Sequence, residues 1–248
     1  MKINNYNIKY YVDTKSSLSF CILVIGVLLA IFSTNNIENL WFRFLMILFN
    51  KYNILILLTS INININKLLI FVNKNYNYLS RTYSYKSVIK NNLKYIFSLI
   101  MYYLSIYIIL SLAGAFIFCH GNIKVVNYFN TNIIIYIIYS LLKMIAAILT
   151  MNSFYYLLSF YIKKIFITFI AIIFNFSILF IPDQTVILHF YNIIPLYTFF
   201  LTLTPYLNFR LEVLCAFLYL SVTTSVNEIL YSFIISKKGR RLWWILHF

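Results

Sequence analysis

Polar side chains inside long apolar runs are the first candidates for chemistry in this sequence. Lys143, Asn152, Asn175 and the adjacent Asn227 and Glu228 all lie in such runs. A charged or amide side chain within hydrocarbon is costly, so it usually faces a bundle interior or a water-filled cavity. Two uses fit these five residues: hydrogen bonds between helices, or contact with a substrate that crosses the membrane.

The acids and histidines that an enzyme would need are few. The chain has five Asp and Glu residues and three His residues, without H-x-x-x-H or H-E-x-x-H spacing, so we predict no metal site. Its four glycines form neither a phosphate-binding loop nor a dinucleotide turn, so we expect this chain not to hydrolyse ATP by itself. With so few acids and histidines, we also expect no cofactor and no enzyme activity in this chain. Asp183 and His189 are the one pair close enough in sequence to suggest an active site. An enzyme that acts on lipid therefore stays an alternative function for this chain.

The composition predicts an integral membrane protein. Of the 248 residues, 62% are hydrophobic and 10% are charged, whereas a soluble domain is roughly 45 to 50% apolar and about 25% charged. A net charge of +15 is also typical of proteins that bind the phosphates of nucleic acid. In so apolar a chain, the enrichment of basic residues in cytoplasmic loops explains this charge better, so we expect a lipid bilayer as partner and no nucleic acid.

Six apolar runs predict an all-α membrane protein with one transmembrane domain, residues 1–248. Residues 39–50 are interpreted as an interfacial segment outside the membrane. The segment 182–210, interrupted by three prolines, predicts a short re-entrant structure on the outer side between the fifth and sixth helices, because the backbone groups that proline frees need protein or water as partners. The predicted spans cover residues 18–34, 53–72, 96–118, 133–160, 165–181 and 211–236.

The distribution of basic residues predicts that both termini are cytoplasmic. Most of the 20 Lys and Arg residues fall in the amino-terminal segment, the loop after the second span, the turn after the fourth span and the carboxyl-terminal tail. Four lie on the opposite side, at Arg43, Lys51, Lys124 and Arg210. This asymmetry favours an even number of crossings and a location in the cell membrane.

The predicted cytoplasmic loop at residues 73–94 carries the most informative motif. Its residues 78–86 read YLSRTYSYK, and an amphipathic run, SVIKNNLK, leads from there into the third span. The loop contains no acid and five bases: Lys74, Arg81, Lys86, Lys90 and Lys94.

This motif resembles the loop between the second and third spans in membrane subunits of ABC-2 type exporters. The resemblance is to the small bacterial permeases linked to export of, or immunity to, bacteriocins and antimicrobial peptides. Arg81, Ser84 and Lys86 match the family pattern. Tyr83 replaces the usual glycine, and Tyr85 stands where a second basic residue is frequent.

The resemblance extends to the layout of the whole chain, with six spans, cytoplasmic termini and a broken segment before the last span. It implies a permease that moves an amphipathic peptide or lipidic substrate outward, a second permease chain, identical or not, and a cytoplasmic ATPase subunit that binds the ATP. The coupling surface for this ATPase would be formed by Arg81, Ser84, Lys86 and Lys90.

Two interpretations stay open beside this one. The basic loop can lie against anionic lipid without any protein partner. The chain can also be a standalone immunity protein that binds or shields against a bacteriocin without transport. The second interpretation predicts activity without an ATPase and tolerance of substitutions at Arg81 and Lys86.

Overall fold

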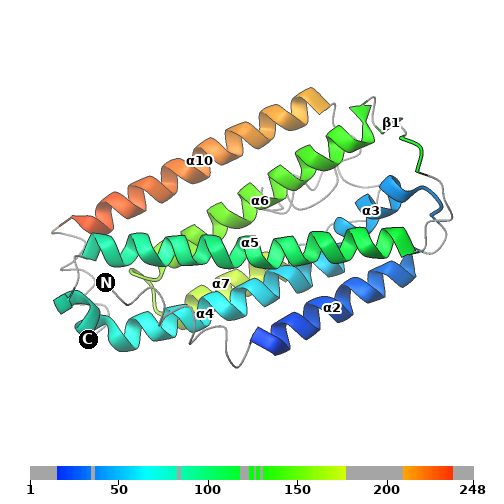
Figure 1. Cartoon of the computed structure of the whole chain (residues 1–248). Helices are drawn as coiled ribbons and strands as arrows, with labels where there is room; N and C mark the ends of the chain where they lie inside the picture. Colours follow the sequence, from blue (N-terminus) through cyan, green and yellow to red (C-terminus); the bar gives the residue numbers. More distant parts are fainter. Residues whose placement is uncertain are drawn as a thin grey trace.

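The computed structural model describes residues 16–34, 37–82, 85–117, 123–125, 127–128, 131–176 and 209–236. Within these ranges the protein is a bundle of helices. A short antiparallel pair of strands lies at one end of the bundle (Figure 1). The helices are α2 Ser16–Ser33, α3 Leu40–Leu48, α4 Lys51–Thr82, α5 Tyr85–Ile117, α6 Ile133–Leu158, α7 Lys164–Phe176 and α10 Phe209–Ile235, and the strands are β1 Asn127–Tyr128 and β2 Thr131–Asn132.

Three described helical segments are long and apolar enough to cross a membrane: Ile89–Ile117, Ile133–Leu158 and Ala216–Ile235. A fourth crossing results if α3 and the first part of α4, which are bent by 50°, form one broken span. The apolar helices at the first and fifth predicted spans are shorter, at Phe20–Phe32 and Ile165–Phe176. The predicted re-entrant segment at 182–210 lies outside the described residues, except where α10 begins.

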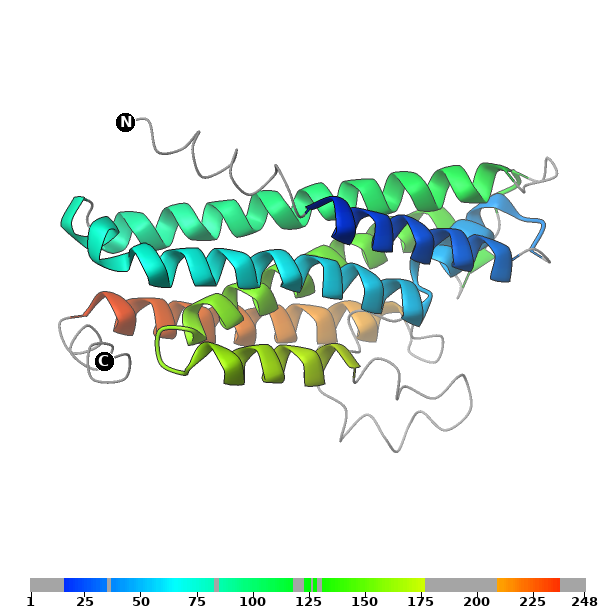
Figure 2. The same cartoon turned by 90° about the horizontal axis from the view of Figure 1, so that it is seen from below.

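The helices pack side by side along their lengths, as two perpendicular views show (Figures 1 and 2). Helices α2, α4 and α5 pack on one another, and α6 contacts α3, α4, α5, α7 and α10. Glycines allow α2 to approach both of its long neighbours closely, because a Cβ at Gly26 would meet Ile56 and one at Gly114 would meet Ile31. Helix α10 lies at the edge of the bundle and packs mainly on α6.

The segment 39–50, predicted as interfacial, forms a helix that packs into the bundle. Helix α3 is buried within the bundle, mainly against α5, and the side chain of Arg43 is 0% exposed. The hydroxyl of Tyr107 donates to the carbonyl oxygen of Leu48 at 2.6 Å, and Nδ2 of Asn53 donates to that of Ile47 at 3.0 Å. These two side chains satisfy the carbonyl groups that the bend frees, which is what allows a helix to break inside a bundle.

The predicted cytoplasmic loop at 73–94 is helical at all of its described residues. Helix α4 continues to Thr82 and α5 begins at Tyr85, so only residues 83–84 of this segment lie outside the description. The segment contains neither glycine nor proline. Its Lys, Arg and Leu residues favour helix, so no residue in it requires the chain to leave that conformation.

Candidate functional site

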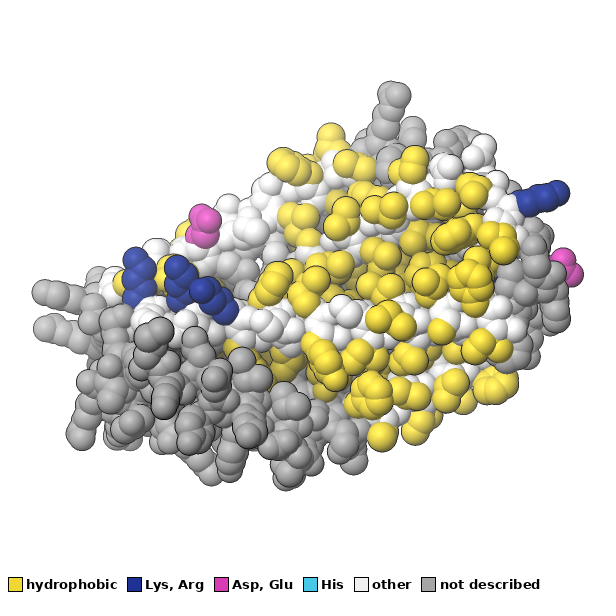
Figure 3. Space-filling view, in the orientation of Figure 1, with side chains coloured by type: hydrophobic (Ala, Val, Ile, Leu, Met, Phe, Trp, Pro, Cys, Tyr) yellow, Lys and Arg dark blue, Asp and Glu magenta, His cyan; other side chains and the backbone are white. Residues whose placement is uncertain are grey.

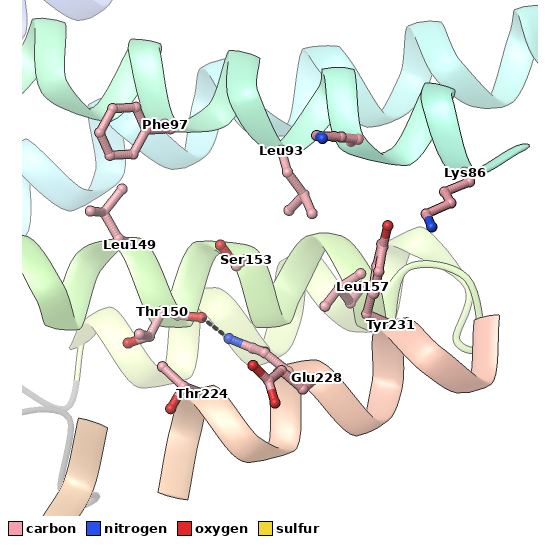
Figure 4. Close-up of a pocket in the computed structure, with 12 residues that line it drawn as sticks. Lys86, Leu93, Phe97, Leu149, Thr150, Ser153, Leu157, Thr224, Glu228 and Tyr231 are labelled. Atoms are coloured by element: carbon pink, nitrogen blue, oxygen red, sulfur yellow. Dashed lines mark hydrogen bonds between the residues drawn. The ribbon is translucent and has the colours of Figure 1, made fainter. Parts of the chain in front are cut away.

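An open groove of about 560 Å³ lies between α5, α6 and α10. Helix α6 forms its floor, while α5 and α10 form facing walls (Figure 4). Helices α5 and α10 each pack on α6. The volume lies within the range of roughly 300 to 1,000 Å³ that is typical of ligand sites.

Opposite charges face this groove from two different helices. Lys86 and Lys90 are exposed and lie four residues apart on α5, so they share one face of that helix. Glu228 is exposed on the α10 wall. The charged lining therefore consists of two ammonium groups and one carboxylate.

A hydrogen bond holds the α10 wall against the floor beside Glu228. Nδ2 of Asn227 donates to the main-chain carbonyl oxygen of Thr150 at 3.0 Å, as the dashed line in Figure 4 marks. The hydroxyl of Thr150 donates back to Ala146 O at 3.0 Å, within its own helix. Bonds of this kind between membrane helices contribute on average about 0.6 kcal/mol.

The other end of the groove is apolar. Phe97 and Leu149 line it on the side away from Lys86, and Leu93 lies between them and the charged end (Figure 4). Phe97 is 51% exposed, so this end is open to the surroundings of the bundle. The groove thus offers charges at one end and hydrocarbon at the other, which is the arrangement that an amphipathic ligand requires.

The surface around the groove is arranged in the same way. Hydrophobic side chains cover a broad band of the described surface in Figure 3, and Lys and Arg side chains lie beyond the two ends of this band. Helix α5 is the clearest example, because the exposed Lys86, Lys90 and Lys94 precede its apolar part. The charged end of the groove therefore lies at an edge of the hydrophobic band.

The structure brings together four of the nine residues that the sequence singled out: Lys86, Lys90, Asn227 and Glu228. Arg81 lies in the last turn of α4, and Ser84 is outside the described residues. Two of these four residues were predicted to couple to an ATPase, and the other two were predicted to make polar contacts within the membrane. All four line one groove.

Lys143, Asn152 and Asn175 are buried in the bundle and do not line the groove. Nζ of Lys143 lies 5.7 Å from the ring centroid of Tyr139. Nδ2 of Asn152 donates to Ile148 O at 2.7 Å within α6. The Oδ1 atoms of Asn152 and Asn175 have no hydrogen-bond partner among the described residues. These contacts place Lys143 and Asn152 in the internal packing of α6.

Sequence reasoning missed the floor of the groove. Thr150 and Ser153 lie three residues apart on α6 and line it together with Thr224 of α10. Their spacing places the two α6 residues on one face of the helix, and this was the available signal. It did not reveal that α5 and α10, far apart in sequence, cover the same face of α6.

The long apolar helices, the buried polar side chains between them and the hydrophobic outer band define a helical membrane protein. Comparison of the chain with protein-family models, curated proteins and solved structures found no match in any of the three. The geometry of the bundle and the chemistry of its groove are therefore the features that bear on the function of the chain.

Proposed function

We propose that the chain is the membrane-spanning permease subunit of an exporter powered by an ATPase on a separate chain. Its substrate is an amphipathic peptide or a lipid-like molecule that moves outward. In this proposal the protein has six crossings and cytoplasmic termini, with α2 and α7 supplying the two crossings that are short in the described residues, and it pairs with a second permease chain.

The observation that carries the proposal is the length of the two helices that meet at residues 82–85. Helices α4 and α5 have 32 and 33 residues, so each is about 50 Å long. The hydrocarbon core is only about 30 Å thick. Since the apolar part of α5 ends toward Ile117, the excess length lies at the basic end and projects from the hydrocarbon core through the headgroup region.

A projecting pair of packed helices suits coupling to a soluble motor. Helices α4 and α5 contact each other, so a force applied at their tip moves both as rigid elements. The tip carries two bases, Arg81 in the last turn of α4 and the exposed Lys86 near the start of α5. The groove with its charged and apolar ends supports the amphipathic character of the substrate.

The test is co-purification of an ATPase with the tagged protein in mild detergent from its own host. We expect a nucleotide-hydrolysing subunit to accompany the wild-type protein. The double substitution Arg81→Ala and Lys86→Ala should reduce its recovery by at least about tenfold, because each lost charge-assisted bond is worth roughly 1.5 to 3 kcal/mol. Lys124→Ala, which removes an exposed base at the opposite end of the bundle, is the matched control.

Two outcomes contradict the proposal. If the protein elutes alone, yet still protects cells from a bacteriocin, it is a standalone immunity protein. If the ATPase is absent and the double substitution weakens only binding to anionic vesicles, the basic tip is a lipid contact. Thermal melting and size-exclusion profiles equal to those of the wild type show that the variant is folded.

A further inference from the structure

We propose that the groove between α5, α6 and α10 binds an aminophospholipid. Lys86 and Lys90 hold the headgroup phosphate, Glu228 holds the headgroup amine, and an acyl chain lies along the apolar end. This site does not depend on the proposed ATPase, because all of its residues belong to the chain itself.

The pair of lysines supplies the phosphate contact. Both side chains are exposed and line the same wall, one helical turn apart, so two ammonium groups can reach one phosphate. Basic pockets between membrane helices commonly bind lipid headgroups in this way. Figure 4 also shows Ser153 on α6 between the two charged walls, where its hydroxyl can donate to a phosphate or ester oxygen.

Glu228 determines which headgroup fits. It lies within the candidate span Ala216–Ile235, several residues before its end. A carboxylate at this depth is costly unless a cation reaches it. A headgroup that carries a phosphate and an amine supplies one charge of each sign, matching the two lysines and the glutamate. Phosphatidylglycerol would satisfy the lysines but leave the carboxylate without a cation.

The position of the groove favours a lipid over a peptide. The groove opens on the hydrophobic face of the bundle, where lipid is the solvent, and its charged end lies at the edge of that face (Figure 3). Leu93, Phe97 and Leu149 continue from the charges into this face, as an acyl chain continues from its headgroup. A cationic amphipathic peptide would meet Lys86 and Lys90 with the same sign of charge.

The test measures lipid binding to the purified full-length chain by native mass spectrometry. The probes are phosphatidylethanolamine and phosphatidylglycerol with identical acyl chains. We expect the wild-type protein to prefer phosphatidylethanolamine. Glu228→Gln should weaken binding of that lipid by about tenfold, the worth of one charge-assisted contact, and should reverse the preference. Lys86→Gln with Lys90→Gln should weaken the binding of both lipids.

Matched controls separate the groove from general surface charge. Lys94→Gln removes an exposed base from α5 that does not line the groove, and Glu38→Gln removes an exposed acid at the other end of the bundle. Both should bind the two lipids as the wild-type protein does. Unchanged thermal melting shows that each groove variant is folded.

Three results would overturn the proposal. The first is equal binding of the two lipids by the wild-type protein. The second is a dependence on the lysines without any dependence on Glu228, which identifies a site for anionic lipid. The third is a groove that binds a cationic amphipathic peptide and neither lipid. Lys86 belongs to both the groove and the proposed coupling tip, whereas Glu228 lines only the groove and Arg81 lies only at the tip. The effect of Glu228→Gln on lipid binding therefore tests this site alone. Its failure leaves the coupling proposal standing, which Arg81→Ala tests without changing a groove residue.

Discussion

At the level of single residues, hydrogen bonds between asparagine and tyrosine side chains connect the long helices. Nδ2 of Asn64 on α4 donates to the hydroxyl of Tyr103 on α5 at 2.8 Å, and Nδ2 of Asn92 on α5 donates to that of Tyr156 on α6 at 2.9 Å. All four side chains are buried. These polar side chains thus face protein and join neighbouring helices.

Removal of one such hydroxyl should weaken the bundle by a predictable amount. Tyr103→Phe leaves Nδ2 of Asn64 with its bond to Ser60 O at 2.9 Å and removes the bond to α5. We expect the free energy of unfolding to fall by about 0.6 kcal/mol, the average measured for bonds between membrane helices, and by no more than the measured maximum of about 1.7 kcal/mol. Denaturant titration in micelles measures it.

Tyr102→Phe is the matched control for this substitution, because Tyr102 is the adjacent residue of α5 and is 58% exposed. Its loss of a hydroxyl should leave the unfolding free energy unchanged within error. Equal effects of the two substitutions would show that the bond between Asn64 and Tyr103 does not contribute to stability.

At the level of the helices, the close contact between α2 and α5 depends on Gly114. A side chain at position 114 would enter the space of the Ile31 side chain on α2. Gly114→Ile should therefore separate the two helices and lower the unfolding free energy by about 1 to 3 kcal/mol, as overpacking does in other cores. Thermal melting in detergent measures the change.

The adjacent Ala113 provides the control for this contact, since it is exposed on the outside of the bundle. Ala113→Ile adds the same side chain on a face directed toward lipid and should leave the melting temperature nearly unchanged. A loss of stability in this variant as large as that of Gly114→Ile would mean that the α2 contact is not responsible.

The sequence predicted helices where apolar runs are long, and it failed where helix boundaries depend on tertiary contacts. Helices α5 and α6 cover most of the predicted spans at 96–118 and 133–160. Residues 39–50 were interpreted as interfacial because a span through them would contain Arg43 and Lys51, and because the segment is aromatic. The surrounding helices bury the Arg43 side chain, and its Nη2 donates to Ile31 O at 3.5 Å. Local composition cannot reveal a partner from another helix.

At the scale of the whole molecule, the charged end of α5 should lie outside the hydrocarbon core, at the level of the lipid headgroups and beyond. Lys90 and Ser105 are both exposed on the protein, but they are 15 residues apart on one helix, about 22 Å along its axis. In a variant without Cys21, Cys119 and Cys215, Lys90→Cys should react with a membrane-impermeant maleimide. Ser105→Cys should react only after detergent is added.

The side of the membrane follows from the same measurement. If the basic end is cytoplasmic, Lys90→Cys should react in inside-out vesicles and not in intact cells. Reaction in intact cells would reverse the proposed orientation. Reaction of Ser105→Cys without detergent would show that the middle of α5 faces water instead of lipid.

The candidate site could be predicted only in part, because it joins distant segments of the chain. Lys86 and Lys90 were identified from a basic motif, and Glu228 from its position in an apolar run. Nothing in either pattern indicates that α10 faces α5 across α6. That arrangement is set by the packing of α6 against both helices, together with the bond from Asn227 to Thr150.

The peripheral position of α10 has a consequence for biosynthesis. Helices α2 to α7 precede it in the chain and already contact one another, whereas α10 depends mainly on α6 for its place. The ribosome therefore delivers a bundle that can pack before α10 is inserted. The groove needs α10 as its second wall, so it forms only after α10 has been synthesised.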